Sequence, residues 1–168
     1  MTVDSSFDEI YEELFPIIFR FVRTRVAESE IEDITVETLT KIWKALPGFK
    51  GESSLKSWAL RIAYNQVADF YRSRKAVSLI SLTEIETVQS VHDHSESWTE
   101  LLSVEQTLAK LPAQQVTAIQ LRLIEGFSAA EVGEVLGISP KAVDSLLYRA
   151  KKSFRKLYEL EHKGGKRV

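Results

Sequence analysis

The sequence contains no cysteine, one methionine, seven glycines and four prolines. The absence of cysteine excludes disulfide bonds, thiol catalysis and zinc sites built from cysteine, and it suits a reducing cytoplasm. No apolar run approaches the roughly 20 residues that a membrane-spanning helix needs. The acidic N-terminus also lacks the basic start and apolar core of a signal peptide. We therefore expect a cytoplasmic protein with no direct membrane insertion.

Histidine is scarce as well, and its positions do not favour a metal site. His92 and His94 lie in a polar stretch, and His162 lies near the C-terminus. A metal site at His92 and His94 is the alternative to a solvated linker, which we favour. The sequence also lacks a glycine-rich phosphate loop and a paired-carboxylate signature. An enzyme is therefore disfavoured, and we expect no catalytic residue, no metal, no cofactor and no small-molecule substrate.

Charge is unevenly distributed along the chain, although the net charge is only −2. Residues 1–40 carry ten acidic side chains against three basic ones, whereas residues 53–76 carry five basic ones against one acidic one. Residues 141–168 carry nine basic side chains against three acidic ones. Two basic segments on an acidic body indicate two nucleic-acid contact surfaces, although solvated helix faces would explain either segment alone.

Helical periodicity dominates the whole sequence, and strand-like alternation is rare. Apolar residues recur three and four positions apart, so the predicted fold class is all-α. We expect two small helical domains, at residues 1–76 and 97–168, joined by a flexible linker at 77–96 that is rich in Ser, Thr, Glu, Asp and His. Within the first domain, Pro16 is expected to bend one helix, and Ser29 is expected to begin a capping box for the next.

The segment 127–155 has the local signals of a helix-turn-helix. Ser128 and Glu131 form a capping-box pattern, and Gly137 can take the left-handed conformation that ends the first helix. Ser139 can cap the second helix, where Pro140 occupies the first helical position at no cost in hydrogen bonding. An ordinary helical hairpin with a basic face is the alternative. The agreement of caps, turn and basic stripe favours a unit that reads the DNA major groove.

A second polar stripe is expected on the helix that begins near Ser54. Arg61, Asn65, Asp69 and Arg72 follow one another at intervals of four, four and three, so they share one helix face. Guanidinium, amide and carboxylate groups can pair with base edges and phosphates. Aromatic residues nearby could stack on bases, and they are Trp58, Tyr64, Phe70 and Tyr71. A solvated face with local ion pairs is the alternative. The presence of a DNA-binding helix-turn-helix downstream favours the nucleic-acid surface over this alternative.

Together these segments resemble the bacterial extracytoplasmic-function (group IV) sigma factors over nearly the whole chain. The segment 32–43 looks like region 2.2, and the segment 57–72 looks like regions 2.3 and 2.4. The segment 111–128 with the helix-turn-helix looks like region 4. This resemblance implies a non-enzymatic sigma factor that binds the clamp and flap of core RNA polymerase, directs promoter-specific transcription and is held inactive by an anti-sigma factor.

The resemblance also implies roles for particular residues. The contact with core polymerase would involve Asp33, Glu37, Thr38, Lys41 and Trp43. The −10 element would be bound by Lys56, Arg61, Asn65, Asp69 and Arg72, together with the loop 49–53. The −35 element would be bound by Ser139, Lys141, Ala142, Asp144, Ser145, Tyr148, Arg149 and Lys152.

Three positions depart from the pattern of that family. Val36 stands where the family usually has glutamine, so a polar contact with polymerase is expected to be missing. Asp144 and Leu146 stand where lysine or arginine is common, which predicts weaker phosphate anchoring and an unusual −35 preference. Two alternatives remain open, namely a helix-turn-helix regulator that binds operators without polymerase, and a degenerate sigma-like protein that sequesters a partner.

Overall fold

The structure is a computed structural model that describes residues 7–78, 103–104 and 106–163 of the 168-residue chain. The described residues contain helices and no strand, which confirms the predicted all-α class. By their internal contacts the residues divide into two compact units, at Met1–Val91 and His92–Val168. The predicted linker at 77–96 lies outside the described residues, apart from the last turn of one helix.

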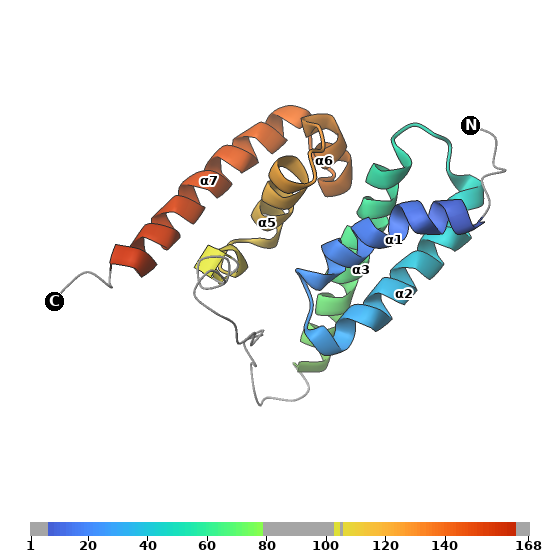
Figure 1. Cartoon of the computed structure of the whole chain (residues 1–168), viewed down its shortest axis with the longest axis horizontal. Helices are drawn as coiled ribbons and strands as arrows, with labels where there is room; N and C mark the ends of the chain where they lie inside the picture. The colour runs from blue at the N-terminus through green and yellow to red at the C-terminus, as the bar shows by residue number, and fades with distance from the viewer. Residues whose placement is uncertain (1–6, 79–102, 105, 164–168) are drawn as a thin grey trace. The chain divides into compact units, whose positions relative to one another are not determined.

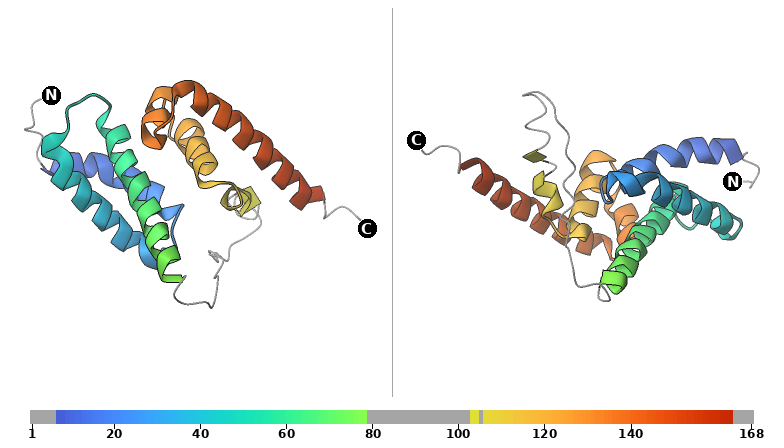
Figure 2. Two further views of the ribbon diagram at one scale, coloured as in Figure 1. Left: turned by 180° about the vertical axis from the view of Figure 1, so that it is seen from behind. Right: turned by 90° about the horizontal axis from the view of Figure 1, so that it is seen from below.

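The first unit is a bundle of three helices, α1 (Phe7–Arg23), α2 (Glu28–Ala45) and α3 (Leu55–Ser78). Each helix contacts the other two, as the two opposite views of the unit show (Figures 1 and 2). A short 3-10 turn, η1 (Leu46–Gly48), follows α2. The core consists of residues that recur at helical spacing and are almost fully buried, and they include Leu14, Ile18, Phe21, Val22, Ile34, Ile42, Leu60, Ala63 and Val67.

Helix α1 continues through Pro16, whose side chain is exposed, so water can reach the carbonyl that lacks its helical partner. The bend expected at Pro16 stays a prediction. One local prediction for the first unit is wrong, because helix α2 begins at Glu28 and its N-cap Ala27 makes no side-chain capping bond. Ser29 therefore lies inside the helix and forms no capping box. The cap expected for α3 is present, because the Ser57 N–H donates to Ser54 Oγ over 3.1 Å.

The second unit contains α5 (Ala113–Ile119), η2 (Gln120–Ile124), α6 (Ala129–Leu136) and α7 (Pro140–Lys163). Residues 103–104 and 106–109 are also helical. Helix α7 packs against both α5 and α6, and Figure 1 shows α5 beside the long α7. The buried apolar residues of this unit come from α5, η2, α6, α7 and the turn before α5, and they include Leu111, Ala118, Leu121, Val132, Val135, Val143, Leu147 and Ala150.

One turn of this unit has a form that the sequence pattern does not reveal. Helix α5 is followed directly by η2, a π-helical turn in which the Glu125 N–H donates to the Gln120 carbonyl over 3.0 Å. The chain then leaves the helix through Gly126 at φ 77°. Arg122 donates to the Phe127 carbonyl over 3.1 Å and so fixes the loop that leads into α6.

The predicted capping box at the start of α6 is present and makes a testable contribution to stability. The Glu131 N–H donates to Ser128 Oγ, and the Ser128 N–H donates to Glu131 Oε2 over 2.9 Å. We expect Ser128→Ala to lower the free energy of unfolding by about 1 kcal/mol, because an orphan N–H of the first turn loses its acceptor. Urea unfolding measures the change. Ser128→Thr keeps the hydroxyl and should unfold close to the wild type; equal losses in both variants would contradict this role.

Candidate nucleic-acid interface

The turn between α6 and α7 has the geometry of a helix-turn-helix. Gly137 ends α6 in the left-handed conformation at φ 69°, and the Ile138 N–H donates to the Gly133 carbonyl over 2.9 Å. Ser139 accepts a hydrogen bond from the Ala142 N–H over 3.2 Å, and Pro140 is the first residue of α7. Each of these local features agrees with the sequence prediction.

The predicted −35 residues lie along one side of the first half of α7. Seven of the eight are exposed, and Ala142 is half-buried. Tyr148 is 70% exposed, and the Ser145 hydroxyl donates to the Lys141 carbonyl over 3.1 Å. The exposed members of this −35 surface are Ser139, Lys141, Asp144, Ser145, Tyr148, Arg149 and Lys152. The surface therefore offers three cations, one carboxylate and several hydroxyl groups.

Leu146 does not belong to this surface. Its side chain is only 6% exposed and lies among the core residues Val143 and Leu147. Positions 143, 146, 147 and 150 share the buried face of α7 because they are three or four residues apart. Leu146, which departs from the family pattern, is therefore a packing residue. The expectation that its side chain affects binding to the −35 element is corrected. Asp144 remains as the exposed departure on α7.

The predicted −10 residues lie on the exposed side of α3. Lys56, Arg61, Asn65, Asp69 and Arg72 are all exposed. Arg72 Nη1 lies 2.9 Å from Asp69 Oδ1, so the carboxylate offsets part of the positive charge of this −10 surface. Lys56 lies 3.6 Å from a carboxylate oxygen of Glu13 in α1. These five residues therefore lie on the exposed side of α3 as predicted, but three of their charged groups, on Lys56, Asp69 and Arg72, already have partners in the free protein.

The aromatic residues near this stripe mainly make internal contacts. The Phe49 and Trp58 rings lie 4.9 Å apart, which holds the loop after η1 against α3. The Tyr71 hydroxyl donates to the Arg25 carbonyl, and burial raises the pKa of Tyr71 against the opposing effect of Arg74. Stacking of these rings on bases would therefore require some of these contacts to break.

Arg25 joins the end of α1 to α3. Burial lowers the pKa of its guanidinium to about 9, and Tyr64 opposes part of that shift. The group nevertheless stays charged at neutral pH. It donates to the Phe21 carbonyl over 2.8 Å and lies 3.6 Å from the centre of the Phe21 ring. These contacts hold the half-buried Arg25 side chain against the last turn of α1.

The predicted polymerase-binding residues lie on α2, with one exception. Asp33, Glu37, Lys41 and Trp43 are exposed. Thr38 is fully buried, and its hydroxyl donates to the Ile34 carbonyl over 2.6 Å. Position 38 is one helical turn from a core residue on either side, so it faces the bundle interior. The proposed direct contact through Thr38 is therefore corrected to a role in packing.

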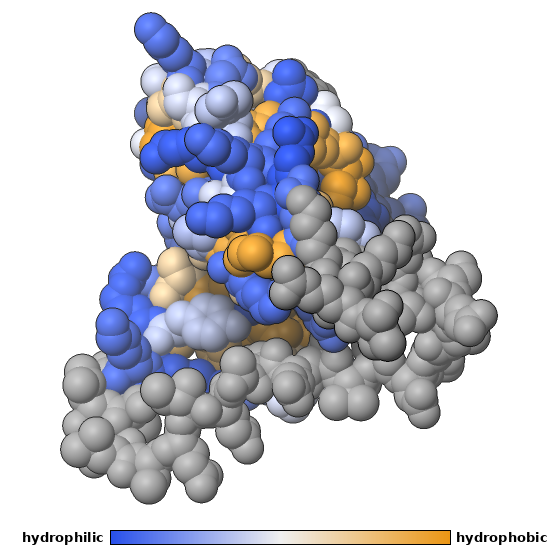
Figure 3. Space-filling view, turned by 90° about the vertical axis from the view of Figure 1, so that its left-hand side faces the viewer, coloured by the Kyte–Doolittle hydropathy of each residue, from blue (hydrophilic) through white to orange (hydrophobic). Residues whose placement is uncertain are grey.

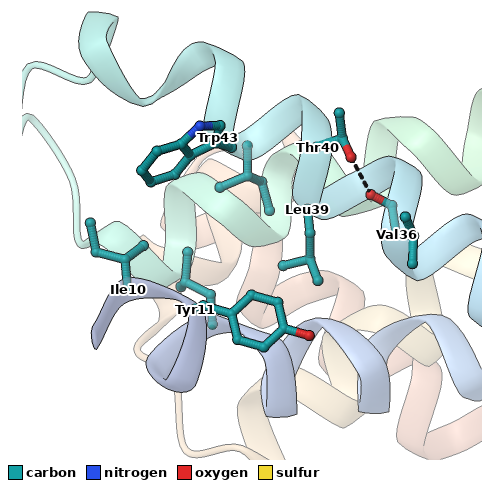
Figure 4. Close-up of a pocket in the computed structure, with 8 residues that line it drawn as sticks. Ile10, Tyr11, Val36, Leu39, Thr40 and Trp43 are labelled. Atoms are coloured by element: carbon teal, nitrogen blue, oxygen red, sulfur yellow. Dashed lines mark hydrogen bonds between the residues drawn. The ribbon is translucent and has the colours of Figure 1, made fainter. Parts of the chain in front are cut away.

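An apolar hollow lies between α1 and α2, beside these charged residues. Its volume is about 350 Å³. In Figure 4, Ile10 and Tyr11 of α1 face Leu39 and Trp43 of α2, and Val36 lies farther along α2. Large apolar side chains at its rim are open to solvent, since Val36 is 56% exposed and Trp43 is 46% exposed. Because these side chains adjoin one apolar hollow, they form a candidate interaction surface. No sequence motif points to Tyr11 as part of a site.

Gln66 is a second residue that the sequence analysis did not select. It lies on α3 and is only 6% exposed, yet its amide meets two of the proposed polymerase-binding residues. Gln66 Nε2 donates to Glu37 Oε2 over 2.6 Å, and Lys41 Nζ donates to Gln66 Oε1. Only tertiary structure brings these three side chains together, because α2 and α3 are separated by a loop.

Hydrophilic residues predominate over apolar ones where Figure 3 colours the described residues by hydropathy, and the apolar residues form smaller patches. Within the part of the chain that the structure describes, no helix is both long and apolar enough to cross a membrane. The same described residues contain no group of three His, Asp or Glu side chains that could hold a metal ion. His92 and His94 lie outside the described residues.

Comparisons with known proteins agree with the division into two units. A family model for sigma-70 region 2 matches residues 10–77, and a model for sigma-70 region 4 matches residues 101–154. RNA polymerase sigma factor NccH of Alcaligenes xylosoxydans xylosoxydans is 30% identical over 133 residues, which cover 75% of this chain and 72% of NccH. RNA polymerase sigma factor YlaC of Bacillus subtilis is 26% identical over 160 residues, which cover 92% and 91% of the two chains.

A solved structure is similar over both units. It is the sigma factor RpoE in complex with the anti-sigma factor NepR from Bartonella quintana. The TM-score is 0.79 at 25% sequence identity, and the match covers 91% of this chain and 96% of that one.

Proposed function

Because the chain belongs to the extracytoplasmic-function sigma factors of the sigma-70 family, we propose that it binds core RNA polymerase and directs transcription from a small set of promoters. One observation supports this most strongly. A single chain carries an exposed acidic and apolar surface on α2, a polar stripe on α3 and a helix-turn-helix. An operator-binding regulator needs only the last of these.

Each of the three surfaces is assigned a binding partner according to its chemistry. Helix α2 with Asp33, Glu37, Lys41 and Trp43 is proposed to bind the polymerase clamp, and the second unit is proposed to bind the flap. The stripe on α3 is proposed to bind the −10 element with its cations and amide. The −35 surface on α7 is proposed to enter the major groove, which admits a helix.

We also propose that the protein catalyses no reaction of its own. The sigma-70 proteins are initiation factors, and promoter opening would draw on binding energy within the assembly with polymerase. A base that leaves the stack can be read on all its edges. The stripe on α3 and the loop that Phe49 holds against Trp58 are the proposed site for such a base.

An anti-sigma factor is the proposed regulator of this activity. RpoE, which is similar over both units, was solved in complex with the anti-sigma factor NepR. CnrH, which is 27% identical over 92% of this chain with a TM-score of 0.68, was solved with the cytosolic domain of CnrY. A partner that covers the exposed apolar rim of the α1–α2 hollow would exclude polymerase from the same surface.

Direct binding to core polymerase separates the three functional hypotheses. The purified chain should co-elute with core polymerase in the absence of DNA, and the assembly should then retain a promoter fragment that core alone does not retain. DNA binding without any binding to core would favour an operator-binding regulator. Binding to core without retention of promoter DNA would favour a degenerate protein that sequesters its partner.

Asp144 supplies a test of the −35 surface. We expect Asp144→Lys to tighten binding to a −35 fragment by about tenfold and to steepen its salt dependence by about one phosphate contact, because a repelled carboxylate becomes an attracted ammonium. Fluorescence anisotropy at several salt concentrations measures both. Glu159→Lys, an equal charge change farther along α7, is the control. Unchanged affinity and unchanged base preference in Asp144→Lys would remove Asp144 from the interface.

A further inference from the structure

One buried amide on α3 holds two exposed charges of α2. The Gln66 amide donates to Glu37 through its nitrogen and accepts from Lys41 through its oxygen. The two ends of the amide thus match a carboxylate and an ammonium group in polarity. Reversing the amide would place its NH₂ group against the ammonium and its oxygen against the carboxylate, so the arrangement admits one orientation.

This amide changes how Glu37 and Lys41 are presented. The two residues are four positions apart on α2, where opposite charges on a surface usually pair loosely in solvent. Here both side chains are hydrogen-bonded to the amide of Gln66, a residue that is only 6% exposed. Hydrogen bonds to charged groups are stronger than neutral ones. The rotamers of two long side chains are thereby fixed before any partner arrives, which lowers the entropic cost of binding.

The position of Gln66 links two surfaces that the proposed function uses separately. Gln66 directly follows Asn65, which faces outward in the −10 surface, while Gln66 itself faces α2. A change in the packing of α2 against α3 would therefore move Glu37 and Lys41 on α2 relative to the −10 surface on α3. Direct contact of Gln66 with polymerase is not required, since its amide is buried.

We propose that Gln66 is a positioning residue for polymerase binding, which it supports by holding Glu37 and Lys41 in the arrangement that core polymerase recognises. This inference rests on the proposed sigma-factor function and adds a residue that acts only through its neighbours. It differs from a purely structural role, in which the amide would stabilise the bundle without affecting affinity for polymerase.

The test compares binding of Gln66→Met and of the wild-type chain to core polymerase. Methionine keeps the length and volume of glutamine but loses both hydrogen bonds. We expect binding about tenfold weaker, which corresponds to one to two lost hydrogen bonds, with intact helical content. Ser73→Ala is the matched control on α3, because it removes only a local bond to the Phe70 carbonyl, and its affinity should equal that of the wild type.

A second experiment, in a chain already changed at positions 37 and 41, distinguishes a positioning role of Gln66 from a general loss of folding stability. In a chain that carries Glu37→Met and Lys41→Met, adding Gln66→Met should cause no further loss of affinity, because the two charged groups that the Gln66 amide holds are already absent. Wild-type affinity for Gln66→Met, or an equal further loss in that doubly changed chain, would overturn the inference. If Gln66→Met fails to fold, Gln66→Glu takes its place, since it still accepts from Lys41 but repels Glu37. A wild-type chain that does not bind polymerase would overturn the proposed function and this inference together.

Discussion

Gly133→Ala is expected to disrupt the helix-turn-helix and to abolish binding to the −35 element. A Cβ atom at this position would lie 2.6 Å from the Ile138 carbonyl oxygen, a distance that real Cβ contacts do not show. The obstacle is backbone, and the same short turn is fixed by the hydrogen bond from Ile138 N–H to the Gly133 carbonyl. The turn would have to move away from α6, at a cost of roughly 2–3 kcal/mol.

Two measurements on the full chain test this expectation. Urea unfolding should show the loss of stability, and anisotropy with a −35 fragment should show the loss of binding. Gly48→Ala is the control, because a Cβ at Gly48 meets no atom within 4 Å and its backbone is not left-handed. A Gly133→Ala protein that is as stable as Gly48→Ala and binds DNA normally would show that the turn can relax at little cost.

Trp43→Ala is expected to weaken binding to core polymerase by at least about thirtyfold, with little change in folding stability. The indole is 46% exposed at the rim of the α1–α2 hollow, so the fold does not need all of its area. Exposed tryptophans that become buried in an interface typically contribute about 2 kcal/mol or more. Equilibrium binding to labelled core polymerase measures the loss.

Leu160→Ala is a suitable control for Trp43→Ala. Leu160 is also an exposed apolar residue, at 65% exposure, but it lies near the far end of α7, in the unit proposed to bind the flap and not the clamp. Its removal should weaken binding much less than Trp43→Ala does, because the α1–α2 hollow is proposed for the clamp contact alone. If both variants bind core polymerase as the wild type does, the α1–α2 hollow is not part of the polymerase contact.

The helix-turn-helix was predictable because its signals are local. Gly137, Ser139 and the Ser128 capping box each determine the conformation of a few neighbouring residues, and no distant contact is needed to form them. The same locality explains the correct stripe on α3. Caps are not fully specified by a pattern, however, since Ser29 matches a capping box but lies inside α2.

The errors at Thr38 and Leu146 have a different origin. Both were assigned by their place in a family pattern, but the side of a helix that becomes buried depends on its partners. Thr38 faces α1 and α3 from the interior side of α2, and Leu146 lies on the side of α7 that carries Val143 and Leu147. Helical periodicity around these residues contained the signal, because each lies three or four positions from an apolar residue.

Gln66 and the α1–α2 hollow could not be predicted from the sequence. The amide of Gln66 meets Glu37 across 29 positions of the chain, and Tyr11 and Trp43 line one hollow from two different helices. Neither arrangement has a signature in residue spacing, because both arise only when the helices pack. The π-helical turn at Gln120–Ile124 was likewise not indicated by residue spacing, and it is followed by Gly126 in the left-handed conformation.

Transcription in a purified system tests the central claim most directly. Core polymerase is mixed with fragmented genomic DNA of the source organism, with and without the wild-type chain, and the 5′ ends of the transcripts are mapped. We predict that the chain adds a small set of start sites, that these share one −10 and one −35 sequence, and that Gly133→Ala removes them. Stable binding to core polymerase without any new start site would contradict the claim.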